Sequence, residues 1–140
     1  MVTYVLDASA LVRFLEGDAS ARRIKEVFAD ATSGKCKVSI SSVNWGEVIG
    51  VIAKRQGKAA AEGLRGDLAI YGLEIISVTA ERAFRSAYIK LDIKIPYANS
   101  FAVELASAPE HILITITADF DFKPAAQSIS IEFLPAKSKP

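Results

Sequence analysis

The chain has 140 residues, of which 51% are hydrophobic, with a single cysteine and a formal net charge of +1. These values suit one globular domain and exclude a disordered chain, an internal disulfide and a multi-cysteine metal site. The balance of 17 basic against 16 acidic residues gives no bulk signal for nucleic-acid binding, which would have to come from local charge. The lone cysteine fits a reducing cytoplasm, and no apolar run approaches the ~18 residues of a membrane span.

Strand-like apolar runs alternate along the chain with segments of helical periodicity. Strands are predicted at 2–6, 38–40, 73–78, 112–116 and 128–134. Helices are predicted at about 8–15, 21–33, 43–55, 58–71, 80–91 and 98–107. This alternation predicts an α/β fold, a three-layer α/β/α sandwich around a mostly parallel sheet. We expect one domain over residues 1–134 and a flexible C-terminal tail at 135–140.

Asp7 directly follows the first predicted strand, which ends at Leu6. Ligand crevices of open α/β sheets lie at the carboxyl ends of their strands, so this acid stands where a site is expected. A carboxylate there is costly to desolvate unless something positive meets it. The competing interpretation is structural, because aspartate is also a favoured N-cap for a helix beginning at Ala8.

Glu47 lies on a predicted helix, and its neighbours four residues away on either side are Val43 and Val51. It therefore projects from an apolar stripe, where an unpaired glutamate is rare. The alternative is a capping box in which Asn44 is the N-cap and Glu47 occupies the third helical position. Two serines just before Val43 compete for that cap.

A second acidic strand end follows residues 112–116, the most apolar strand after the first. Asp119 repeats the placement of Asp7, Asp121 lies two residues further on, and Thr117 is placed to orient a carboxylate or a water. A helix cap or Asx turn would also explain Asp119. Taken together, three acids on three separate elements favour a Mg²⁺ or Mn²⁺ site, because carboxylates and water suit these cations.

The order and spacing of four segments resembles the PIN domain and, more narrowly, the VapC toxins of toxin–antitoxin pairs. The segments are Val5-Leu6-Asp7-Ala8-Ser9, Val43-Asn44-Trp45-Gly46-Glu47-Val48, Tyr97-Ala98-Asn99-Ser100-Phe101-Ala102 and Thr117-Ala118-Asp119-Phe120-Asp121-Phe122. The resemblance covers nearly all of the chain and implies a PIN-like sandwich. It also implies a Mg²⁺- or Mn²⁺-dependent endoribonuclease that is homodimeric and is inhibited by a cognate antitoxin whose tail fills an acidic groove.

By this resemblance, Asp7, Glu47 and Asp119 match the family's first, second and fourth acids, and Asp121 matches an additional one. The family's third acid is an aspartate early in the helix after the Pro-Tyr turn, where this chain has Asn99. Three interpretations of Asn99 are open. It caps that helix, or it marks a natural loss of activity, or it is an engineered Asp→Asn change that allowed a toxic protein to be produced.

The implied activity is hydrolysis of RNA phosphodiesters by a metal-activated water. The catalytic residues would be Asp7, Glu47, Asn99 and Asp119. The metal ligands would be the same four together with Asp121, and Ser9 and Thr117 would orient them. The phosphates of an unpaired RNA loop would be held by basic residues near the acids in sequence, namely Arg13, Lys54, Arg55 and Lys123.

Two rival functions remain. One is a catalytically silent protein that binds RNA or an antitoxin through the same groove, which the amide of Asn99 favours. The other is a hydrolase with a strand-end aspartate as nucleophile, but such enzymes usually carry a second aspartate two residues on, where this chain has Ser9. Metal-dependent cleavage of structured RNA would separate the nuclease from the silent protein.

Overall fold

The computed structural model describes residues 1–116 and 120–136, and residues 120 and 121 for their backbone alone. The strands are β1 (Thr3–Leu6), β2 (Lys37–Ser41), β3 (Leu73–Ile76), β4 (His111–Ile116) and β5 (Ser130–Leu134). The helices are α1 (Ala8–Leu15), α2 (Arg22–Thr32), α3 (Ser42–Gln56), α4 (Lys58–Ile70), α5 (Ala80–Ile93) and α6 (Tyr97–Ala106). Two 3₁₀ helices, η1 (Ala19–Ala21) and η2 (Phe120–Gln127), complete the described elements.

The strands form one five-stranded sheet in the order β3-β2-β1-β4-β5, and every neighbouring pair is parallel. The chain moves outward from β1 through β2 to β3, then returns past β1 to build β4 and β5 on its other side. The direction of winding therefore reverses between β1 and β4. In open α/β sheets, this reversal opens a crevice at the carboxyl ends of the two strands.

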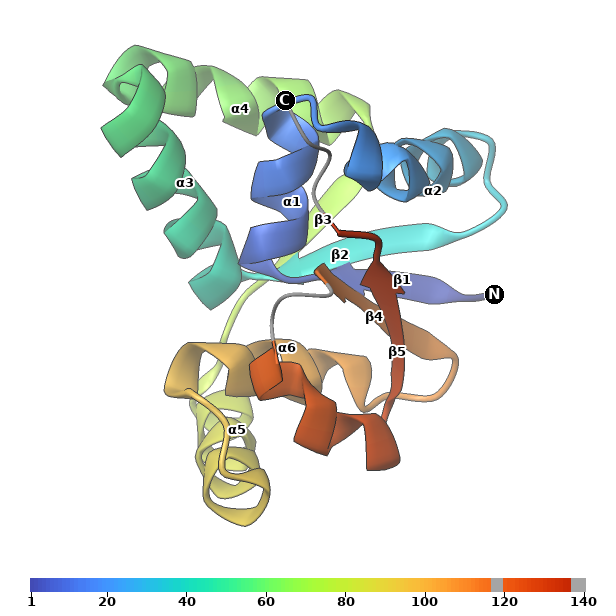
Figure 1. Cartoon of the computed structure of the whole chain (residues 1–140), viewed down its shortest axis with the longest axis vertical. Helices are drawn as coiled ribbons and strands as arrows, with labels where there is room; N and C mark the ends of the chain where they lie inside the picture. The colour runs from blue at the N-terminus through green and yellow to red at the C-terminus, as the bar shows by residue number, and fades with distance from the viewer. Residues whose placement is uncertain (117–119, 137–140) are drawn as a thin grey trace.

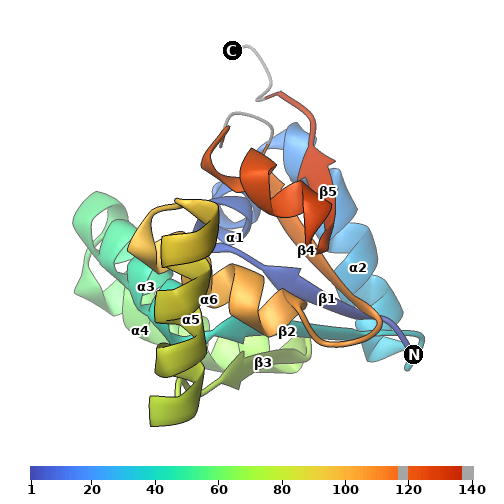
Figure 2. The ribbon, with the colours of Figure 1, turned by 90° about the horizontal axis from the view of Figure 1, so that it is seen from below.

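Helices cover both faces of the sheet, with α1 to α4 on one face and α5, α6 and η2 on the other (Figures 1 and 2). Alternate residues of the strands point to opposite faces of the sheet and pack into two hydrophobic cores. Leu6 and Ile114 point into the first, Val5 and Leu113 point into the second, and all four are fully buried. Strands buried on both faces are typical of parallel sheets. The predicted single-domain α/β/α sandwich is thus confirmed.

Several predicted boundaries differ from those observed. The strand predicted at 73–78 ends at Ile76, and the helix predicted from residue 98 begins at Tyr97. Neither 3₁₀ helix was predicted. Helix η1 is only three residues long, and η2 contains Pro124, a residue that disfavours a helix interior. The predicted tail at 135–140 lies mostly outside the described residues and stays a prediction. No described helix has the length and apolarity needed to cross a membrane.

Helix α6 is fixed to α5 by a glutamate held between two arginines. Glu104 of α6 is only 9% exposed, and its carboxylate accepts hydrogen bonds from Arg82 at 2.8 Å and from Arg85 at 3.2 Å. Arg85 also pairs with Glu81, which is 80% exposed. A buried carboxylate is tolerable only when it is paired in this way. These ion pairs hold the last turn of α6 against α5.

We expect Glu104→Gln to lower the free energy of unfolding by about 1–3 kcal/mol, because it removes charge-assisted hydrogen bonds from a buried position. Glu81→Gln is the matched control, since it removes an acid from the same Arg85 at an exposed position and should change stability by less than about 0.5 kcal/mol. Urea denaturation of the three proteins measures both effects. Equal losses in the two variants would contradict the prediction.

Candidate functional site

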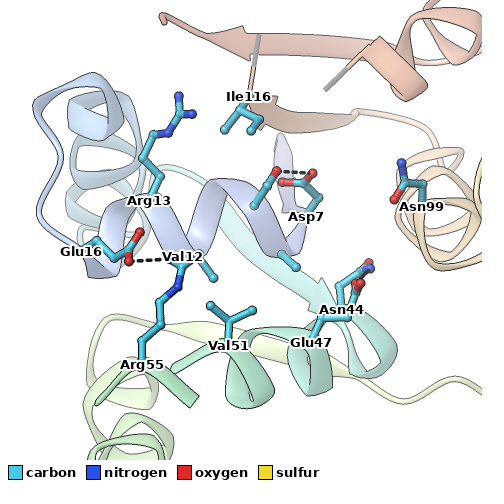
Figure 3. A pocket seen from close by; sticks show the side chains of 12 residues that line it. Asp7, Val12, Arg13, Glu16, Asn44, Glu47, Val51, Arg55, Asn99 and Ile116 are labelled. Carbon is cyan, nitrogen blue, oxygen red and sulfur yellow. Dashed lines mark hydrogen bonds and ion pairs between the residues drawn. The ribbon is translucent and has the colours of Figure 1, made fainter. Parts of the chain in front are cut away.

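A pocket of about 400 Å³ opens where the winding of the sheet reverses. Its walls come from the end of β1 and helix α1, from α3, from the first turn of α6, and from the last residue of β4 (Figure 3). The lining residues are Asp7, Ala8, Ser9, Val12, Arg13, Glu16, Asn44, Glu47, Val51, Arg55, Asn99 and Ile116. Three of the four predicted catalytic residues, Asp7, Glu47 and Asn99, therefore share one pocket.

Asp7 is 4% exposed, and three donors among the described residues bind its carboxylate. Oδ1 accepts from the backbone N–H of Ala10 at 2.8 Å, which makes Asp7 the N-cap of α1. Oδ2 accepts from the hydroxyls of Ser9 at 2.7 Å and Thr115 at 2.6 Å. The capping interpretation is therefore correct, and it coexists with a place in the pocket. Ser9 thus contacts Asp7, while its predicted role toward a metal stays a prediction.

Glu47 reaches the pocket from α3, and one neighbour fixes its carboxylate. The Nδ2 group of Asn44 donates to Glu47 Oε1 at 2.8 Å. The capping-box interpretation is wrong, because α3 begins at Ser42 and Ser41 is its N-cap. The expectation that Glu47 lies on a buried stripe is also wrong, since its side chain is exposed toward the pocket.

Asn99 is the third residue of α6, half-buried, and it lines the pocket across from α3 (Figure 3). The interpretation of Asn99 as the helix cap is wrong. Pro96 occupies the N-cap position, and no side chain makes a capping hydrogen bond there. The amide of Asn99 is therefore available to the pocket and is not used to begin the helix.

The two ends of the pocket differ in charge. Asp7, Glu47 and Asn99 gather at one end, while Arg13 and Arg55 lie at the other (Figure 3). Arg55 pairs with Glu16 at 2.5 Å, so its charge is partly offset, and this pair joins α3 to α1. Arg13 donates to the backbone carbonyl of Pro135 at 3.1 Å. The pocket thus combines an acidic end with a basic rim.

The remaining predicted site residues do not line this pocket or cannot be placed. Lys54 is exposed on α3 and Lys123 is exposed on η2, and neither belongs to the lining. Asp119 and Thr117 lie outside the described residues, and for Asp121 only the backbone, within η2, is described. Within the described ranges, no group of three or more His, Cys, Asp or Glu side chains is close enough to hold a metal ion.

Two residues contact the predicted acids although the sequence did not predict these contacts. Thr115, fully buried on β4, donates to Asp7 because β1 and β4 are neighbours with Leu6 opposite Ile114. This pairing of β1 with β4 can be known only once the order of the strands in the sheet is known. Asn44 was considered as a cap, although its spacing of three residues from Glu47 places both on one helix face.

The side-chain atoms at the acidic end of the pocket are of the type that binds a hard divalent cation. Its potential ligands are oxygen atoms of the Asp7 and Glu47 carboxylates and of the Asn99 amide, and no cysteine or histidine lines the pocket. Oxygen ligands of this type suit Mg²⁺ and Mn²⁺. The neutral amide of Asn99 leaves this end with less negative charge than a third carboxylate would.

Three comparisons with known proteins bear on this arrangement. Among solved structures, the chain is similar to VapBC2 from Rickettsia felis bound to a DNA fragment from its promoter, with a TM-score of 0.70 and 18% identity over 94% of this chain and 98% of that one. It is also similar to DNA-bound VapBC from Salmonella typhimurium, with a TM-score of 0.69 and 16% identity over 95% and 98% of the two chains.

A third similar structure is VapC20 from Mycobacterium tuberculosis, a toxin that cleaves the sarcin–ricin loop. Its TM-score is 0.64, with 16% identity over 90% of this chain and 95% of that one. At these identities the likeness shows a shared fold. A search of curated proteins gave no match. The family model described as the PIN domain matches residues 4–127, most of the sequence, and the chain therefore belongs to the PIN domain family.

Proposed function

We propose that this protein is a Mg²⁺- or Mn²⁺-dependent endoribonuclease of the VapC type, the toxin of a toxin–antitoxin pair. The observation that carries the proposal is the convergence of Asp7, Glu47 and Asn99 in one pocket at the reversal point of the sheet. Membership of the PIN domain family supports it. The likeness to VapC20, a toxin that cleaves RNA of the sarcin–ricin loop, supports the choice of RNA as substrate.

In this proposal, the acidic end of the pocket binds the cation and the basic rim binds the RNA. Asp7, Glu47 and Asn99, with Asp119 and Asp121 from the segment after β4, would hold the cation. When bound, a divalent cation supplies a Lewis acid and lowers the pKa of water beside the phosphodiester. Ser9 and Thr115 hold Asp7 through their hydroxyls, so its orientation does not depend on the cation.

The basic rim would hold the phosphates of the RNA. An acidic pocket repels a polyanion, so cations beside it are needed to bind the backbone. Arg13 and Arg55 line the pocket and are placed for this role. We propose Lys54 and Lys123 only as outer contacts, because they lie away from the lining. An unpaired loop would present a single phosphodiester to a pocket of this size.

A catalytically silent protein that binds RNA or an antitoxin through the same pocket is the second candidate. The neutral Asn99 favours it, because an amide oxygen is a weaker ligand for a hard cation than a carboxylate. In both candidates, the antitoxin would present a basic side chain to Asp7 and Glu47, and arginine matches such carboxylates best. The likeness to two VapBC complexes supports an antitoxin partner.

We also propose that the protein is a homodimer that uses the outer face of α5. Phe84, Tyr88 and Leu91 recur at helical spacing on this face and are 60%, 58% and 73% exposed. The ring centroids of Phe84 and Tyr88 lie 4.7 Å apart, with the ring planes tilted by 45°. A continuous apolar face of this kind is typical of a protein–protein contact.

The first test concerns Asn99. Asn99→Asp should increase Mn²⁺-dependent cleavage of a structured RNA by about 10²–10³-fold, because it restores a charged ligand to the pocket. The same variant should inhibit growth when it is produced without an antitoxin. RNA fragment yield with Mn²⁺ and with EDTA measures the effect. No gain in either assay, with the fold intact, would favour the silent protein.

The second test concerns Asp7 as a ligand. In the Asn99→Asp background, Mn²⁺ at a hundredfold excess over its Kd should stabilise the fold by about 2.7 kcal/mol. Asp7→Asn should remove most of this gain, because its amide still caps α1 but carries no charge. Asp18→Asn is the matched control, since Asp18 is also an N-cap that accepts from a serine two residues on, outside the pocket. Equal Mn²⁺ effects in both variants, measured by thermal unfolding, would reject Asp7 as a ligand.

The third test concerns the dimer. Light scattering should give the parent about twice its chain mass of 15.0 kDa, and Tyr88→Glu should give a monomer because it places a charge in the apolar contact. Ile70→Glu is the control, since Ile70 is 79% exposed but belongs to α4, which covers the opposite face of the sheet from α5 (Figure 1). A monomeric parent, or a dimer unaffected by Tyr88→Glu, would show that α5 is not the contact.

A further inference from the structure

Asn44 is the most buried polar side chain on α3. It is 2% exposed, although it lies in the first turns of the helix and beside an open pocket. Burying the side-chain amide of an asparagine costs free energy unless its polar groups are paired. Its presence there needs a compensating interaction.

The amide nitrogen of Asn44 joins two walls of the pocket. Nδ2 donates to Glu47 Oε1 at 2.8 Å within α3 and to the backbone carbonyl of Ala98 at 3.1 Å in α6. Ala98 directly precedes Asn99. One side chain therefore fixes the carboxylate of Glu47 and, at the same time, the first turn of the helix that carries Asn99.

The orientation of this amide follows from its partners. Both partners of Nδ2 are acceptors, a carboxylate and a carbonyl, so each takes one of the two N–H groups. The opposite orientation would place Oδ1 against two oxygens and lose both hydrogen bonds. In the observed orientation, Oδ1 is buried and finds no hydrogen-bond partner among the described residues. The observed orientation therefore keeps both hydrogen bonds that Nδ2 donates and leaves Oδ1 without a partner among the described residues.

We infer that Asn44 is a positioning residue of the pocket, which acts through Glu47 and through the first turn of α6. It sets how far apart the carboxylate of Glu47 and the side chain of Asn99 lie. The inference deepens the proposed function, on which its consequence for cation binding rests. Its structural part, the coupling of Asn44 to Glu47, needs no cation and can be tested alone.

A double-mutant cycle without metal tests the coupling. Asn44→Leu keeps a similar volume and removes the donors, Glu47→Ala removes the acceptor, and the double variant closes the cycle. Urea unfolding in EDTA should give a coupling of about fivefold or more in the unfolding equilibrium constant, because the bond involves a charged acceptor. If Asn44→Leu does not fold, Asn44→Ala, which also removes both donors, takes its place. Additive effects would overturn the inference.

Mn²⁺ affinity separates positioning from a general structural role. We expect Asn44→Leu to weaken Mn²⁺ binding by about tenfold or more, measured by electron paramagnetic resonance in the parent and Asn99→Asp backgrounds. Ser42→Ala is the matched control, since its hydroxyl also links α3 to a neighbouring segment, accepting from the N–H of Val78 at 3.0 Å. It should change the affinity by less than about twofold.

The two measurements can reject the role of Asn44 and the metal-dependent function independently of each other. If the Asn44 variant binds Mn²⁺ as the Ser42 variant does, Asn44 does not position the pocket. If neither background binds Mn²⁺ while the cycle remains coupled, the metal-dependent function is rejected and the role of Asn44 toward Glu47 stands.

Discussion

The structure depends on a carboxylate buried between two central strands. Asp7 follows β1 at the point where the winding reverses, and it is 4% exposed. Its desolvation is offset by donors from three places, the first turn of α1, the hydroxyl of Ser9 and the hydroxyl of Thr115 on β4. The same group therefore begins a helix, joins two strands and supplies charge to a pocket. Losing these donors would leave the buried carboxylate of Asp7 poorly paired, at a cost in stability.

The other walls of the pocket are held by contacts that lie behind it. Glu104, at the far end of α6, fixes that helix to α5 through Arg82 and Arg85. Asn44 fixes the near end of α6 to α3. Helix α6 is thus held at both ends, so its first turn has little freedom to move relative to Glu47. Preorganisation of this kind matters for a cation site, where ligands must be held to within about 0.5 Å.

The alternation of apolar strands and periodic helices was enough to predict the sandwich and most element positions. It was enough because parallel strands buried on both faces leave continuous apolar runs such as 112–116. Asp7 and Glu47 could be selected because each acid interrupts an apolar pattern. Thr115 could not, since its contact requires that β4 pair with β1 across 108 residues of sequence. The 3₁₀ helices were not predicted, because η1 has only three residues and η2 has Pro124 in its interior.

For Asn99, the residue type alone led to a wrong structural interpretation. Its residue type suits a helix cap, and only the structure, which places Pro96 at the cap and Asn99 in the first turn, removes that interpretation. Arg13 and Arg55 were selected with Lys54 and Lys123 for closeness in sequence alone. The structure separates the pairs, because residues one position apart on a helix, such as Lys54 and Arg55, point in different directions.

The hydrogen bond from Arg13 to Pro135 links the rim of the pocket to the margin of the sheet. Pro135 directly follows β5, which lies at one edge of the described sheet, where its neighbour is β4 (Figure 1). Edge strands open more readily than central ones in local unfolding, because only one side of their backbone is paired. Detachment of β5 would release Arg13 from its acceptor while Asp7 and β1 stay folded. The acceptor that holds Arg13 therefore lies beside the edge of the sheet, whereas the contacts that hold Asp7 come from α1 and the central strands.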